Sequence, residues 1–151
     1  MEYYSVTYEQ TINASQVKVW NILANRFGEI GSISDSIKNS VYVDNIKEGI
    51  GTKRHCKLSP FGYAVETVTI WNEPNEFEFE IEETSMPMEK GGKLHFDLIS
   101  LSDTQTKILV NATFRLKVVG FLSPLMKPML LKIIKTMLSD FESHLNKERK
   151  L

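Results

Sequence analysis

Apolar and polar side chains alternate along most of the chain, which is the pattern of strands that bury one face and expose the other. In the clearest case, Phe77, Phe79 and Ile81 alternate with three glutamates. Such runs predict strands over residues 4–12, 39–46, 52–58, 63–72, 76–84, 92–102 and 105–119. Because each run has one apolar and one polar face, the pattern favours an antiparallel sheet with one side in solvent.

Helical spacing replaces this alternation between the first two predicted strands. Ser15 is placed to cap a helix, and Trp20, Leu23 and Phe27 follow at intervals of three and four. Two glycines then interrupt the spacing, so residues 27–35 are expected to form an irregular segment or a second short helix.

A long amphipathic helix is predicted at the C-terminal end, because apolar residues recur at three and four positions up to Leu145. Ser123 followed by Pro124 is typical of an N-cap with proline in the first helical position. Pro128 cannot donate a hydrogen bond to the carbonyl of residue 124. It therefore predicts a kink, or a helix that begins only at Pro128.

Composition narrows the class of protein. The chain has 151 residues, 42% of them hydrophobic and 25% charged, which fits one globular domain spanning residues 1–151. A net charge of −1 argues against nucleic acid as a partner. The single cysteine, Cys56, excludes an internal disulfide. We expect no signal peptide, no transmembrane segment and a cytoplasmic location.

Charge is unevenly distributed along the chain. Residues 73–89 contain seven acids and no base, whereas residues 117–151 contain seven bases and three acids. The simplest interpretation is a solvated acidic sheet face and a lysine-bearing helix. A weak peripheral contact with anionic membranes is the alternative.

Residues that carry enzyme chemistry do not form a recognisable motif. His55, His95 and His144 lack the spacing of a metal site, and no nucleophile is paired with a base. We therefore expect no metal, no cofactor and no catalytic residue. Tyr63, beside a predicted loop, is kept as a candidate acid.

Three short motifs occur in an order that suggests a known family. They are the stretch 12–20 entering the first helix, Gly49-Ile50-Gly51-Thr52-Lys53-Arg54, and a strand bearing Glu66 followed by Trp71-Asn72-Glu73-Pro74. Over about residues 3–147 the chain resembles the START-like helix-grip superfamily. This superfamily includes the birch-pollen allergen, the abscisic-acid receptors and the polyketide cyclase/dehydrase and lipid transport group. The chain departs from it at residues 33–37, where many members have Trp-x-x-Pro.

The resemblance implies an α+β helix-grip fold. A curved, seven-stranded antiparallel sheet would wrap around the long C-terminal helix, with two short helices between strands 1 and 2. A cavity can remain between the sheet and the helix. Its implied ligand is a hydrophobic small molecule.

Alternation and helical spacing select the side chains that face this cavity. Val41 and Val43 are also expected to face inward. The candidate ligand-binding residues are Arg54, Cys56, Glu66, Val68, Phe77, Phe79, Met86, Met88, Leu94, Phe96, Phe114, Met126, Met129, Ile133 and Met137. Arg54 and Glu66 point inward from adjacent strands, so they form an ion pair or anchor a carboxylate or hydroxyl of the ligand.

Three functions remain open from the sequence. The first is a non-catalytic binder or carrier of a lipid, isoprenoid or polyketide-like molecule, with the loops at 60–62 and 86–88 as lids. The second is a polyketide cyclase, aromatase or dehydratase that uses the same cavity. The third is a protein- or membrane-interaction module that uses the lysine-bearing helix.

Overall fold

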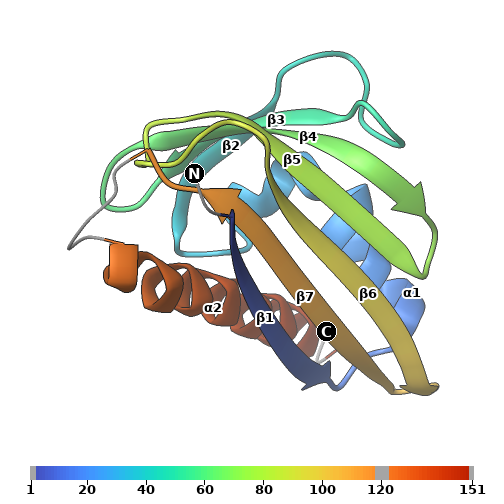
Figure 1. Cartoon of the computed structure of the whole chain (residues 1–151). Helices are drawn as coiled ribbons and strands as arrows, with labels where there is room; N and C mark the ends of the chain where they lie inside the picture. Colours follow the sequence, from blue (N-terminus) through green and yellow to red (C-terminus); the bar gives the residue numbers. More distant parts are fainter. Residues whose placement is uncertain (1–2, 118–122, 150–151) are drawn as a thin grey trace.

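The computed structural model describes residues 3–117 and 123–149, and Figure 1 shows the arrangement of their elements. The elements are β1 Tyr3–Ile12, α1 Gln16–Trp20, η1 Asn21–Asn25, η2 Phe27–Ser32, β2 Ile37–Tyr42, β3 Lys53–Leu58, β4 Tyr63–Asn72, β5 Glu76–Thr84, β6 Gly92–Ser102, β7 Gln105–Arg115 and α2 Ser123–Arg149. The Ser15 side chain accepts a hydrogen bond from the backbone of Lys18, so it caps α1 as predicted. This order of elements is the one predicted for the α+β helix-grip fold, and the single sheet with α2 on its concave side confirms it.

The strands form one antiparallel sheet in the order β1-β7-β6-β5-β4-β3-β2. Residues that face inward are paired across the strands, as Val6 is with Ala112 and Phe96 with Val110. The sheet bends from β1 and β7 toward β2, and α2 lies along its concave side (Figure 1). This curvature encloses the apolar faces of both layers.

The helix α2 packs on the sheet through Met126, Leu130, Ile134 and Leu138, all of which are buried. A step of four residues turns slightly more than once around a helix, so this stripe shifts slowly along α2. Met129 and Ile133 lie at its margin and are 40% and 37% exposed. They do not belong to the packed stripe.

The helix begins at Ser123 and continues through Pro128, so a start delayed to Pro128 is wrong. Pro128 removes only the hydrogen bond to residue 124, which lies in the exposed first turn. The carbonyl of residue 124 can be hydrated there at little cost in free energy. Residues 118–119, at the end of the last predicted strand, fall outside the described residues, and β7 ends at Arg115.

The strand predicted over 39–46 is displaced and shorter, because β2 spans Ile37–Tyr42. A bulge between Ile37 and Asn39 shifts its register by one residue. A shift of one residue exchanges the two faces of a strand. Val41 is therefore paired with His55 on the outer face and is exposed, and Val43 lies beyond the strand end and is also exposed. The prediction that both valines face inward is wrong.

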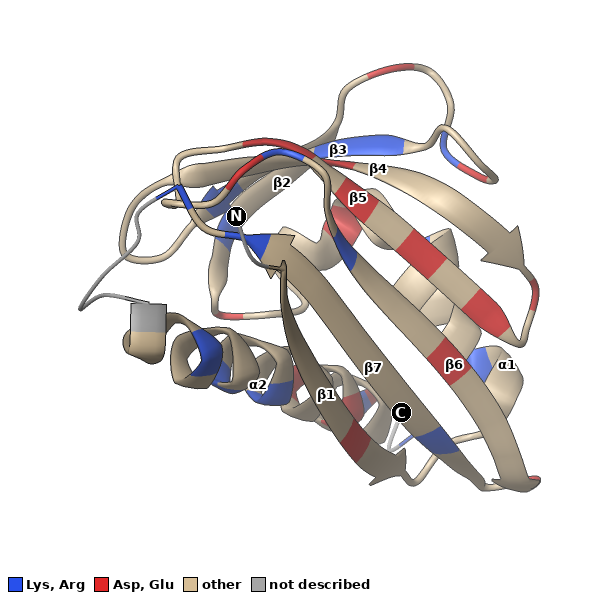
Figure 2. Ribbon diagram, in the orientation of Figure 1, with Lys and Arg blue, Asp and Glu red and all other residues tan. Residues whose placement is uncertain are grey.

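Acidic and basic side chains gather on different elements of the fold. Figure 2 shows acids along β5 and lysines along the first half of α2. No helix in the described part of the chain is both long and apolar enough to cross a membrane.

Candidate ligand-binding cavity

A cavity of about 440 Å³ lies between the sheet, α2 and the segment after η2. Small-molecule pockets commonly measure roughly 300–1,000 Å³. The lining residues are Ile30, Ser34, Ser36, Ile37, Arg54, Leu58, Ser59, Pro60, Phe61, Ala64, Glu66, Phe79, Ser85, Met86, Pro87, Leu94, Met129, Ile133, Ile134 and Met137. Phe61 is 83% exposed, and Met129 and Ile133 are also exposed, so these three side chains mark the opening.

The structure brings eight of the fifteen candidate residues to the cavity wall. They are Arg54, Glu66, Phe79, Met86, Leu94, Met129, Ile133 and Met137. The other seven are buried in the packed core away from the wall: Cys56, Val68, Phe77, Met88, Phe96, Phe114 and Met126. Alternation identifies the concave face of a strand, but it does not tell which part of that face meets a void.

Arg54 and Glu66 lie directly opposite each other on β3 and β4. Arg54 Nε donates a hydrogen bond of 2.6 Å to Glu66 Oε2, and their side chains are 5% and 12% exposed. A charge buried without a partner would cost several kcal/mol, so each of these two residues needs the other as its partner. The ion pair proposed from the sequence is present and borders the cavity.

Further contacts fix the Arg54 guanidinium. Nη1 donates a hydrogen bond of 2.8 Å to the carbonyl oxygen of Phe27, where η2 begins. The guanidinium carbon also lies 3.8 Å from the centre of the Phe27 ring and 5.0 Å from that of Phe79. Arg54 therefore ties η2 to the sheet. Within the described residues, no hydrogen bond reaches Oε1 of Glu66.

The segment that includes η2 forms one wall and is held closely against β2. A Cβ atom built on Gly31 would lie 2.8 Å from the backbone nitrogen of Ser40, which explains the need for glycine there. The Ser40 hydroxyl accepts a hydrogen bond from Gly31 N and donates one to Gly28 O. Ser34, which lines the cavity, donates to the Asp140 carboxylate on α2 at 2.8 Å. Sequence reasoning missed Ile30, Ser34 and Ser36, because this segment has no regular period.

Tyr63 does not face the cavity. Its ring stacks on His55 at 5.5 Å on the outer face, and its hydroxyl donates a hydrogen bond of 2.7 Å to Glu83. This hydrogen bond raises the pKa of Tyr63 above its usual value. Ala64, the next residue, points the opposite way and lines the cavity. The candidate acid at Tyr63 is therefore placed wrongly for chemistry in the cavity.

Cys56 is buried behind the cavity wall and should be chemically inert in the folded protein. Burial raises the pKa of its thiol to about 11, while Arg54 lowers it and Glu66 raises it by smaller amounts. At pH 8 only about one thiol in a thousand would then be the reactive thiolate. We expect a thiol reagent such as Ellman's reagent to modify Cys56 slowly in buffer and rapidly in urea. Free glutathione at the same pH is the control, and equal rates in buffer and urea would contradict this burial.

The fold and the cavity together define a START-like helix-grip domain. A family model described as polyketide cyclase / dehydrase and lipid transport matches residues 4–146. The chain belongs to this family.

Solved structures with low sequence identity share the fold. Ara h 8.0201 is 15% identical with a TM-score of 0.81, and the alignment covers 97% of this chain and 99% of that one. Major latex-like protein 151 from Panax ginseng is 11% identical with a TM-score of 0.80, covering 94% and 97%. A START superfamily protein from Mycobacterium smegmatis is 13% identical with a TM-score of 0.78, covering 95% and 97%. No curated protein matches the sequence.

Proposed function

We propose that this chain binds and carries a hydrophobic small molecule of the lipid, isoprenoid or polyketide-like class. The cavity of about 440 Å³ carries this proposal, because its wall is apolar apart from Arg54, Glu66 and four serines. Burial of apolar ligand surface contributes roughly 25 cal/mol per Å² before the costs of association. The family description, which includes lipid transport, is consistent with this role.

The ion pair supplies a polar contact at the cavity wall. Arg54 and Glu66 neutralise each other, and Oε1 of Glu66 has no hydrogen-bond donor among the described residues. A ligand carboxylate would bring a second negative charge next to Glu66, whereas a ligand hydroxyl can donate to it. The pair therefore favours a ligand with a neutral polar group.

A cyclase or dehydratase is the second candidate, since the family description names both activities. Such chemistry needs an acid or base with a suitable pKa beside the substrate. The titratable side chains on the described cavity wall are Arg54 and Glu66, and they are hydrogen-bonded to each other. This pairing favours binding without catalysis.

Filling the cavity from the sheet should weaken binding while leaving the outer face unchanged. Ala64 lines the cavity, and a phenyl ring there would project into it. We expect Ala64→Phe to weaken binding of the neutral fluorophore N-phenyl-1-naphthylamine by about tenfold or more, equivalent to at least 1.4 kcal/mol. Fluorescence titration of both proteins measures this.

Val65→Phe is the matched control, because Val65 is the next residue and is paired with His55 on the outer face. It should bind the fluorophore like the unmodified protein. Circular dichroism establishes that both variants are folded. Equal affinity for Ala64→Phe and the unmodified protein would show that the fluorophore binds elsewhere and would refute the proposal.

A further inference from the structure

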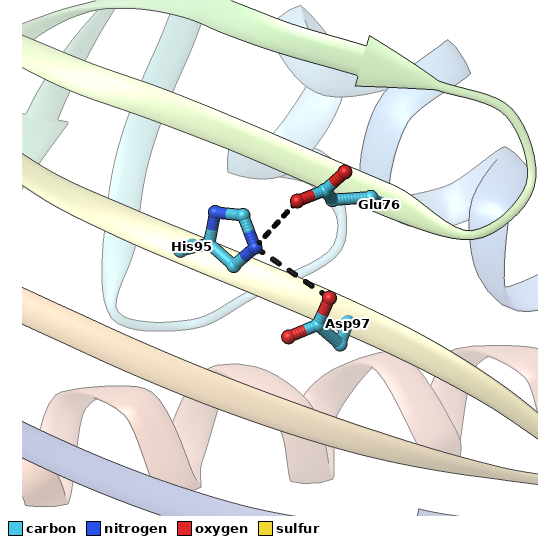
Figure 3. A group of neighbouring side chains, drawn as sticks. All are labelled: Glu76, His95 and Asp97. Atoms are coloured by element: carbon cyan, nitrogen blue, oxygen red, sulfur yellow. Dashed lines mark ion pairs between the residues drawn. The ribbon is translucent and has the colours of Figure 1, made fainter.

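A cluster of four ionisable side chains lies on the outer face of the sheet, on the side opposite the cavity. Glu76 and Glu78 come from β5, and His95 and Asp97 come from β6. Glu76 is paired with Asp97 and Glu78 with His95 in the strand register. Figure 3 shows Glu76 and Asp97 converging on the His95 ring. The paired strands hold these positions in a fixed arrangement.

The two nitrogens of His95 have different partners. Nδ1 lies 2.9 Å from Oε2 of Glu78, whose side chain is only 13% exposed. Nε2 lies 3.0 Å from Oε2 of Glu76 and 3.5 Å from Oδ1 of Asp97. A carboxylate only accepts hydrogen bonds, so Glu78 fixes the proton on Nδ1. Nε2 faces two more carboxylates, and this nitrogen can bind a metal ion only in the neutral imidazole, when it carries no proton.

This arrangement places three potential electron-pair donors around one point. The lysine that pairs with the cluster, Lys93, contacts Glu78 Oε1 at 3.9 Å. The potential ligand atoms of Glu76, His95 and Asp97 all lie within 4.8 Å of one another. Among the described ion pairs, Glu76 and Asp97 each have only His95 as a partner. Glu82, farther along the same strand, is instead paired with Lys53 at 3.1 Å. Glu76 and Asp97 therefore differ from Glu82, whose charge is offset by a lysine.

We propose that Glu76, His95 and Asp97 form a binding site for a divalent transition-metal ion such as Zn²⁺. Tetrahedral zinc with bonds of about 2.0–2.1 Å separates neighbouring ligand atoms by about 3.3 Å. The distances from Nε2, 3.0 Å and 3.5 Å, bracket this separation. The imidazole and two carboxylates suit zinc, and the partly exposed position lets water complete the coordination.

Glu78 would support the site without binding the ion. A metal-binding histidine usually donates its second N–H to a carboxylate, which orients the ring and makes it a better ligand. The bond from His95 Nδ1 to Glu78 has this arrangement before any ion binds. The metal would join β5 to β6 on the outer face, independently of ligand binding in the cavity.

The test is calorimetric titration of tag-free protein with ZnCl₂ in a buffer that does not chelate zinc. We expect one ion per chain and a higher melting temperature with zinc than with EDTA. His95→Gln should abolish this binding. Glu78→Gln should weaken it by about tenfold or more. Circular dichroism of each variant without metal shows whether it is folded.

Two matched controls separate this site from adventitious zinc binding. His55→Gln removes a histidine of the same face, and Glu82→Gln removes a paired acid of the same strand. Both should bind zinc like the unmodified protein. Absence of saturable binding, or binding that survives His95→Gln, would overturn the proposal. Loss of binding in His55→Gln would place the ion elsewhere and would also overturn it.

Discussion

Replacing Arg54 with methionine should lower the free energy of unfolding by about 3–5 kcal/mol, the usual cost of removing one partner of a buried ion pair. The substitution leaves the Glu66 carboxylate buried without its hydrogen bond of 2.6 Å. It also leaves the carbonyl of Phe27 without its donor and removes the stacking on the Phe27 ring. Urea unfolding followed by circular dichroism measures the loss of unfolding free energy. The two proteins can be compared if this free energy depends on urea concentration with the same slope in both.

The double variant Arg54→Met with Glu66→Leu is the control for this interpretation. Apolar replacement of both partners removes the unpaired charge, so most of the lost stability should return. The double variant should still bind apolar probes but should lose any preference for an alcohol over the matching hydrocarbon. If Arg54→Met costs less than about 1 kcal/mol, the pair behaves as an exposed one and the buried-pair account is wrong.

Replacing Phe77 with alanine should also cost about 3–5 kcal/mol, the range measured for buried aromatic residues. Phe77 is completely buried at the centre of an aromatic cluster. Its ring lies within 6.3 Å of five other aromatic rings: Trp20, Phe27, Trp71, Phe79 and Phe96. The transfer of a phenyl ring and the cavity left behind both contribute to the cost.

Comparison with Phe79→Ala distinguishes the effect of losing core packing from the effect of changing the cavity wall. Phe79 is the next inward residue on β5 and lines the cavity, whereas Phe77 does not. At a temperature where both variants are folded, Phe77→Ala should keep its affinity for N-phenyl-1-naphthylamine. Phe79→Ala should change it, because the substitution enlarges the cavity. A loss of stability below about 1 kcal/mol in Phe77→Ala would show that this cluster is not the packed core.

Alternation was a sound guide wherever strands pair regularly. It placed Phe77 and Phe79 inward on β5, and it placed Arg54 and Glu66 inward on adjacent strands, where the structure pairs them. The three family motifs then predicted the order in which the helices and strands follow one another. The helix-grip topology came from the resemblance to the START-like superfamily, and it buries the apolar faces of the sheet and the C-terminal helix against each other.

The same reasoning failed where local geometry overrides the period. The bulge in β2 exchanged the faces at Val41, which no single-residue propensity would reveal. The period also does not distinguish a void from a filled core: Phe77 and Phe79 share a face, yet only Phe79 meets the cavity. Whether a gap remains depends on how closely α2 and η2 approach the sheet, and that distance is a tertiary property. Ser59 and Ser85 lie outside the strands on the cavity wall, where no period applies.

Native mass spectrometry tests the central claim most directly. Tag-free protein is incubated with excess N-phenyl-1-naphthylamine and sprayed beside Ala64→Phe and Val65→Phe. The proposal predicts one bound molecule in the unmodified protein and in Val65→Phe, and a much smaller bound fraction in Ala64→Phe at the same probe concentration. Apolar molecules that co-purify should be displaced by the probe and can be identified after organic extraction. An unmodified protein that stays free of adducts, or an Ala64→Phe variant that binds equally well, would contradict a ligand-binding cavity between the sheet and α2.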